Sequence, residues 1–230
     1  MGPLDVPDPS PPTSIPSSIN TLSPVMFAST AARRLSLLTT RLFSTTTMTS
    51  NASTTTNTTT TNSEFATFAA GCFWGVQHLF DKHYKTKGLL ASEVGYANGL
   101  ASATNPTYKQ VCTGTTNHAE AVRLQFDPTK VSYDELVTFF FRIHDPTTVN
   151  RQGPDVGTQY RSGIYYYSPA QKATAEAVKQ RVQKYFPKPI ATEVTPIDQF
   201  YTAEDYHQKY LVKNPDGYEC PSHFVREFKD

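Results

Sequence analysis

The feature that most limits how this chain can fold is an abrupt change in composition near residue 63. Residues 1–63 are rich in Ser, Thr and Pro, and hold only five charged and two aromatic residues, whereas residues 64–230 hold the other 26 aromatic residues. A segment with so few apolar groups cannot offset the entropy cost of ordering its backbone. We therefore predict a disordered extension over residues 1–63 and one folded domain over residues 64–230.

Residues 26–48 of this extension carry three arginines, no acidic residue and many hydroxyl groups. That composition is typical of an organelle-targeting helix, although a merely disordered tail fits it equally well. The segment begins at Met26 and ends at Met48. If the choice of start decides the outcome, the protein is cytoplasmic, mitochondrial or both.

Imaging of tagged chains that begin at Met1, Met26 and Met48 tests this targeting hypothesis. We expect the chain from Met26 in mitochondria and the chain from Met48 in the cytosol, because only the first keeps the arginine-bearing segment. Identical cytosolic staining of all three chains would reject the hypothesis.

Residue spacing divides the folded part into strands and helices. Ser132 and Glu135 form a capping box, Ser168 precedes a proline suited to a first helical turn, and Thr202 is expected to cap a last helix. Residues 98–117, residues 145–158 and the tail from Asn214 are expected to be irregular. The expected strands are 64–70, 88–97, 119–127, 160–167 and 190–196, and the earlier helices are 73–86, 132–143 and 169–185. This order predicts an α+β fold, a two-layer sandwich of helices on a mixed sheet with a ferredoxin-like plait core.

Charge and cysteine content narrow the function. Residues 64–230 carry 18 basic and 18 acidic residues, which argues against a nucleic acid partner. No apolar run approaches the roughly 18 residues of a membrane-spanning helix. The three cysteines lack C-x-x-C spacing and the histidines are scattered, so we expect no metal site. An odd number of cysteines favours reactive thiols over a disulfide framework.

Cys72 lies at the expected strand-to-helix junction, between Gly71 and Phe73. A helix start presents free N–H groups and a partial positive charge, a placement that can lower the pKa of a thiol and activate it as a nucleophile. The alternative is a small buried apolar cysteine, which is the usual fate of a lone one.

Glu120 falls on the same strand face as Val122, Leu124 and Phe126. If that face is the core, burial raises the pKa of Glu120 above its usual value of about 4.3, and the neutral acid can donate a proton near pH 7. The alternative is an inward acid at the sheet edge, or one paired with a cation such as Arg161.

The other candidates are aromatic residues and the remaining cysteines. Phe73 and Trp74 follow the cysteine and could hold a methyl group next to sulfur, although core packing is the commoner role of aromatic rings. Cys220 lies in the irregular tail, which we expect to be mobile enough to bring its thiol to a distant partner. Cys112 has an apolar neighbour that indicates a structural role, but it could also react with Cys72.

Eight stretches, in order, make residues 64–230 resemble the peptide methionine sulfoxide reductases of A type, and fungal members in particular. They are GCFWG at 71–75, GYANG at 95–99, PTYKQVCTG at 106–114, HAEAV at 118–122, FFFRIHDPTT at 139–148, QGPDVGTQYRSGIY at 152–165, AEDYHQKYL at 203–211 and NPDGYECP at 214–221. The resemblance implies a catalytic domain over residues 64–230. It also implies roles for residues at matching positions: Cys72 as the nucleophile, Phe73 and Trp74 around the substrate methyl group, Glu120, Tyr108, Asp155 and Tyr160 around the sulfoxide oxygen, and Cys220 as the resolving thiol.

The resemblance further implies the reaction. Methionine S-sulfoxide, free or in oxidised proteins, is reduced through a sulfenic acid and an intramolecular disulfide, with thioredoxin or dithiothreitol as the external reductant and no bound cofactor. We expect a monomer. Two departures stand out: Gln77 replaces the Glu of many members, and the tail has one cysteine, Cys220, where many have two.

Two other functions stay open from the residues alone. One is a thiol hydrolase, in which Cys72 attacks a carbonyl with His118 or His144 as the base. The other is a redox-sensing module without enzymatic activity, which forms a disulfide under peroxide but releases no product.

Overall fold

The computed structural model describes residues 63–229, so the predictions of a disordered extension and of a targeting segment lie outside the described residues. The strands are β1 Glu64–Ala70, β2 Leu89–Ala97, β3 Ala119–Phe126, β4 Arg151–Gln152, β5 Asp155–Val156, β6 Ser162–Tyr166, β7 Glu193–Pro196 and β8 Phe200–Thr202. The helices are α1 Phe73–Tyr84, α2 Tyr108–Cys112, α3 Tyr133–Arg142, α4 Pro169–Val182 and α5 Tyr210–Lys213, with short 3-10 turns η1 Thr158–Tyr160 and η2 Gln183–Tyr185.

Six strands form one mixed sheet in the order β7-β6-β1-β3-β2-β8. The four central strands β6, β1, β3 and β2 run antiparallel to one another, and with α1 and α3 they follow the β-α-β-β-α-β order of a ferredoxin-like plait. Strand β7 extends this core parallel to β6, and β8 extends it antiparallel to β2. The predicted α+β fold with a mixed sheet is therefore confirmed.

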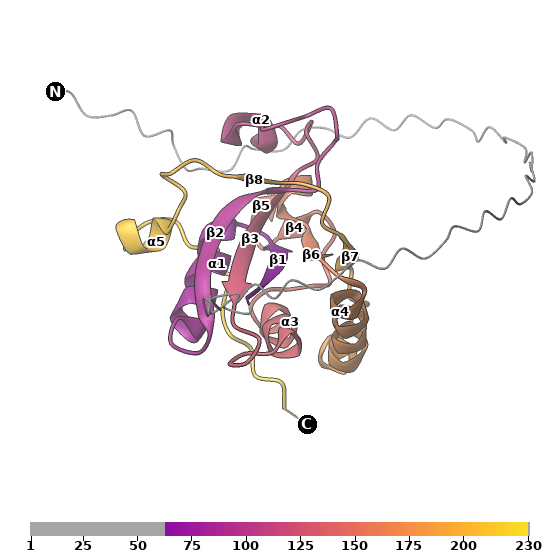
Figure 1. Ribbon diagram of the computed structural model, residues 1–230. Coiled ribbons are helices and arrows are strands. Elements are labelled where there is room, and N and C mark those ends of the chain that lie inside the picture. The colour runs from indigo at the N-terminus through magenta and orange to yellow at the C-terminus, as the bar shows by residue number, and fades with distance from the viewer. Residues whose placement is uncertain (1–62, 230) are drawn as a thin grey trace, which may run out of the picture. The chain divides into compact units, whose positions relative to one another are not determined.

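One face of the sheet packs against helices. Phe68 of β1 and Val122, Leu124 and Phe126 of β3 are fully buried in a core that α1, α3 and α4 share. Alternate strand positions point to the opposite face, where Ala121 belongs to a second, smaller cluster. Helices α3 and α4 lie side by side (Figure 1). The sandwich thus has two layers, one of helices and one of strands.

The helix caps follow the sequence. The Ser132 hydroxyl accepts a hydrogen bond of 3.1 Å from the Glu135 N–H at the start of α3, and the Ser168 hydroxyl accepts one of 3.2 Å from Gln171 N–H at the start of α4. Pro169 occupies the first turn of α4, where a missing N–H costs nothing. Both predicted helix starts are confirmed.

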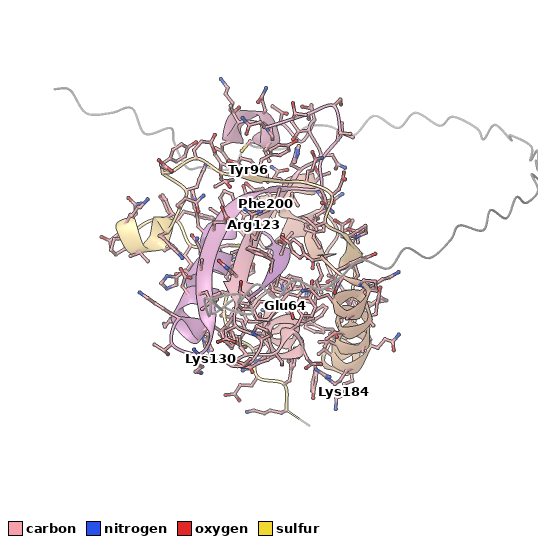
Figure 2. The ribbon with its side chains drawn as sticks, viewed as in Figure 1. Glu64, Tyr96, Arg123, Lys130, Lys184 and Phe200 are labelled. Atoms are coloured by element: carbon pink, nitrogen blue, oxygen red, sulfur yellow. The ribbon has the colours of Figure 1, made fainter. Side chains whose placement is uncertain are left out.

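Thr202 does not begin a helix, so that prediction is wrong. It ends β8, which pairs with the edge of β2, with Thr202 opposite Gly95. Arg123 of β3 and Phe200 of β8 are labelled in Figure 2, and the Arg123 guanidinium lies 4.2 Å from the centre of the Phe200 ring. Pairing with a free strand edge and this ring contact outweigh the weak capping preference of one Thr.

Short elements also replace two expected loops. Helix α2 begins after Thr107. The Thr107 side chain accepts a hydrogen bond from the Gln110 backbone N–H, and the Gln110 side chain accepts one from the Thr107 backbone N–H. Strands β4 and β5 form a small hairpin in which Gln152 pairs with Asp155. Five-residue and two-residue elements are too short to give a periodic signal. No helix within residues 63–229 is long and apolar enough to cross a bilayer.

Candidate active site

Cys72 lies where β1 meets α1, as the residue that precedes the first helical turn. Gly71 before it has φ +88°, a left-handed conformation that favours glycine and turns the chain from strand to helix. Gly75 in the first turn lets His223 of the tail pack closely, because a Cβ at position 75 would overlap the imidazole. The Cys72 side chain is only 6% exposed. The site is therefore a closed junction between a strand end, a helix start and the tail.

Glu120 lies beside this junction. Strand β1 pairs antiparallel with β3, with Phe68 opposite Val122, so the end of β1 and the start of β3 meet at one end of the sheet. Glu120 is 1% exposed, and its Oε2 accepts a hydrogen bond of 3.1 Å from the Phe73 N–H. The alternative pairing with Arg161 is wrong, because the Arg161 Nε donates instead to Glu193 at 2.8 Å. The predicted inward direction of Glu120 is confirmed.

Burial sets the protonation of this carboxyl. It raises the pKa of Glu120 to about 8, with a smaller contribution from the charge of Asp155, while the Phe73 N–H partly opposes the rise. The carboxyl is therefore mostly protonated at pH 7. Its second oxygen can present a proton to a bound group, which is the property expected of a general acid.

The helix start does not lower the pKa of Cys72. Burial raises that pKa well above the usual value, the charge of Glu120 raises it further, and the backbone N–H of Trp74 only partly opposes them. Loss of water around the sulfur outweighs the partial charge of one helix terminus. The resting thiol is thus neutral, and this corrects the expectation of an activated thiolate.

Tyr108 and Tyr160 both lie near Cys72 and Glu120. Burial raises the pKa of each phenol, and the charges of Glu120 and Cys72 add to the rise. Tyr160 lies in η1 and is buried, while Tyr108 begins α2 and donates its backbone N–H to the Glu204 carboxylate at 2.9 Å. Both hydroxyls stay protonated at any ordinary pH, so both can donate hydrogen bonds.

Aromatic side chains pack together at the start of α1, directly after Cys72, and we call Phe73, Trp74 and Tyr210 the aromatic wall. Phe73 and Trp74 are buried, and the Trp74 ring stacks on Tyr210 with ring centres 3.8 Å apart. The Trp74 indole N–H donates to the His207 Nδ1 at 3.0 Å, which needs a neutral imidazole, and burial lowers the pKa of His207 to about 4. The His207 ring also lies 4.5 Å from that of Tyr108, centre to centre. Sequence patterns missed both residues, because His207 lies in a turn and Tyr210 begins the four-residue helix α5, which is too short to give a periodic signal.

The tail is irregular as predicted, but its central part is packed against the domain. Cys220 is fully buried, its Sγ lies 3.6 Å from the Gln152 carbonyl oxygen, and its charge contributes to the pKa of Cys72. The Tyr218 hydroxyl donates to Asp155 at 2.8 Å, and His223 Nε2 lies 2.7 Å from the Ala70 carbonyl oxygen. The expected mobile tail is therefore held next to the nucleophile, and the thiols of Cys72, Cys112 and Cys220 are all free.

Asp155 is almost fully buried, at the start of β5. One carboxylate oxygen accepts from Tyr218, and the other has no hydrogen-bond partner among the described residues. Within residues 63–229 no three His, Cys, Asp or Glu side chains gather in a way that could hold a metal ion. The predicted site residues come together: Glu120, Asp155 and Cys220 lie close enough to Cys72 to raise its pKa, and Cys72 in turn raises the pKa of Tyr108 and Tyr160. Phe73 and Trp74 directly follow Cys72 in α1.

A neutral thiol, a protonated carboxyl, two phenols and a second thiol on a ferredoxin-like plait define a class: enzymes in which a cysteine attacks a group that must also gain a proton. A family model described as peptide methionine sulfoxide reductase matches residues 64–229. A probable peptide methionine sulfoxide reductase of Schizosaccharomyces pombe is 51% identical over 166 residues, which cover 71% of this chain and 96% of that protein. The chain belongs to the peptide methionine sulfoxide reductase family.

Solved structures agree in fold. The reduced form of Mxr1 from Saccharomyces cerevisiae superposes with a TM-score of 0.70 at 46% identity, over 72% of this chain and 93% of that one. Mxr1 in complex with Trx2 superposes with a TM-score of 0.50 at 31% identity, over 72% of this chain and 91% of that one.

Proposed function

We propose that this protein reduces methionine S-sulfoxide, free or within oxidised proteins, to methionine, and so repairs oxidative damage. The observation that carries the proposal is the buried pair of Cys72 and Glu120, in which the acid keeps its proton near neutral pH. A sulfoxide oxygen is a poor leaving group, so it must be protonated or strongly hydrogen-bonded while the sulfur is attacked. Membership of the family supports the choice of substrate.

In the first step the Cys72 sulfur attacks the sulfoxide, with the methyl group against Phe73 and Trp74. Glu120 donates a proton to the oxygen, and Tyr108 and Tyr160 stabilise it by hydrogen bonds. The oxygen passes to the cysteine, giving a sulfenic acid and methionine, and the thiol proton returns to Glu120. Two electrons move from the cysteine to the substrate sulfur, so the step is balanced without a cofactor.

In the second step the Cys220 thiol attacks the sulfenic sulfur, releasing water and forming a disulfide with Cys72. A thioredoxin dithiol then reduces this disulfide by exchange, and dithiothreitol can replace it in the test tube. The Mxr1–Trx2 complex supports thioredoxin as the partner. Since the tail has one cysteine, the first disulfide must itself meet thioredoxin.

The two histidines considered as bases for a thiol hydrolase do not contact Cys72. His144 lies with its Nδ1 2.8 Å from the Phe140 carbonyl oxygen and its Nε2 2.7 Å from the Ser162 hydroxyl. Both ring nitrogens of His118 are buried without a hydrogen-bond partner within residues 63–229, so His118 does not hydrogen-bond to Cys72 either. Neither histidine is arranged to take a proton from the thiol, and this favours the reductase.

Release of methionine from each purified sulfoxide epimer, with dithiothreitol as reductant, tests the proposed function. We expect turnover of the S epimer and little of the R epimer. Release of an acid or amine from an ester or amide without reductant would favour the hydrolase. Disulfide formation under peroxide without methionine release would favour the redox-sensing module.

Changing Cys220 to Ser should separate the two steps. We expect Cys220→Ser to release about one methionine per enzyme and then stop with thioredoxin, because the Cys72–Cys220 disulfide on which thioredoxin acts cannot form. Mass spectrometry of the oxidised wild-type protein should find a Cys72–Cys220 disulfide. Continued cycling of the variant together with a Cys72–Cys112 disulfide would move the resolving role to Cys112.

A further inference from the structure

The buried side-chain amide of Gln77, on α1, hydrogen-bonds both to β2 and to the residue that precedes α5. Gln77 is 1% exposed, and its Oε1 accepts a hydrogen bond of 2.8 Å from the Lys209 backbone N–H. Its Nε2 lies 3.2 Å from the Ser92 carbonyl oxygen and 3.3 Å from the Ser92 hydroxyl of β2. Both ends of this amide are thus used, although the proposed chemistry involves none of these groups.

Lys209 is the residue that this amide holds in place. It has φ +55°, a left-handed conformation that non-glycine residues rarely adopt, immediately before α5. Its Nζ donates to the Asp81 carboxylate and to the Ser92 hydroxyl, each at 2.6 Å, and that hydroxyl donates to Asp81 at 2.8 Å. Such a conformation persists only where its surroundings hold it.

The residues around Lys209 fix the position of Trp74. Tyr210 follows it and stacks on the Trp74 ring, and His207 lies two residues before it and accepts the indole N–H. A shift of the chain at Lys209 would therefore move both partners of Trp74 together. Neither partner belongs to a long helix or a strand that could hold it independently.

We propose that Gln77 is a positioning residue that sets the shape of the surface on which the substrate methyl group binds, formed by Phe73 and Trp74. By holding the Lys209 backbone, it fixes where Tyr210 and His207 meet Trp74. This inference rests on the proposed function, in which Trp74 receives the substrate methyl group. Glu at position 77 would keep the oxygen that accepts the Lys209 N–H.

The test compares Gln77→Met, which keeps a similar length and volume without hydrogen bonds, with Gln77→Glu, which keeps the acceptor. Trp74 is the only tryptophan of the chain, so tryptophan fluorescence reports changes in the surroundings of the Trp74 ring directly. We expect Gln77→Met to shift the emission to longer wavelength and to raise the half-saturating sulfoxide concentration in single-turnover reduction roughly five- to tenfold. The limiting rate should stay within about twofold, because the pocket holds substrate and transition state alike. Gln77→Glu should keep the emission maximum of wild type and a half-saturating sulfoxide concentration within about twofold of wild type.

Three results would overturn the proposal. They are unchanged emission and half-saturation in Gln77→Met, a lower melting temperature as its only effect, or a lower limiting rate at unchanged half-saturation. If Gln77→Met does not fold, Asp81→Ala, at a partly exposed position, removes the Lys209 side-chain anchor and should give the same pattern at smaller size. Emission needs no turnover, so absence of methionine release from wild type would reject the proposed function and leave the emission test standing.

Discussion

Cys72→Ser should abolish methionine release completely, rather than merely slow it. Reduction of a sulfoxide needs a group that gives up two electrons, and a thiol does so by becoming a sulfenic acid. A serine hydroxyl has no comparable oxidised form, so no residual activity is expected even with excess dithiothreitol. The measurement is methionine formed per enzyme in a single turnover, which should fall from about one to none.

The matched control is Cys112→Ser. Cys112 is half-buried on α2 and its thiol interacts with the Tyr108 side chain, an interaction that a serine hydroxyl can keep. We expect this variant to retain wild-type methionine release within about twofold. Methionine release by Cys72→Ser would remove the assignment of Cys72 as the electron donor and would leave Cys112 or Cys220 as the thiol that is oxidised.

The central plait could be predicted from the sequence because its signals are local. Alternation over residues 119–127 gave the inward face of β3, with Glu120 beside Val122, and the caps at Ser132 and Ser168 marked two helix starts. The peripheral elements could not be predicted in this way. Strand β8 exists because β2 has a free edge to pair with, and that depends on tertiary structure rather than on the residue Thr202.

In the candidate site, too, the features with a local signal could be predicted and those that depend on tertiary contacts could not. Cys72 and Glu120 each carry a local signal, but their proximity depends on the pairing of β1 with β3. The pKa of Cys72 follows from a competition between the helix start and burial, and the sequence reveals only the first. His207 and Tyr210 reach Trp74 through a turn that Lys209 and Gln77 fix, a contact between distant parts of the chain that periodicity cannot report.

Glu120→Gln should make the protein more stable at alkaline pH. Because the pKa of Glu120 is raised in the folded state to about 8, the folded protein binds more protons than the unfolded chain between the ordinary carboxyl pKa of 4.5 and 8. Stability therefore falls as pH rises through this window. An amide has no such dependence, so we expect the melting temperature of the variant to match wild type near pH 5 and to exceed it by roughly 10 °C or more at pH 9.

The same substitution should slow reduction of the sulfoxide by roughly 10²–10⁴-fold at pH 6–7, or about 3–5 kcal/mol in activation free energy, because an amide cannot deliver a proton. In wild type the single-turnover rate should fall as pH rises through about 8, where Glu120 loses its proton. The variant should lack that fall, so the two rates should approach each other at pH 9.

Glu120→Asp, which keeps an acid but moves it by one methylene, should retain the alkaline fall in rate. A Glu120→Gln rate equal to wild type at pH 6 would instead assign the proton to Tyr108, Tyr160 or water. A large loss that is independent of pH would mean that the carboxyl acts by hydrogen bonding without transferring its proton.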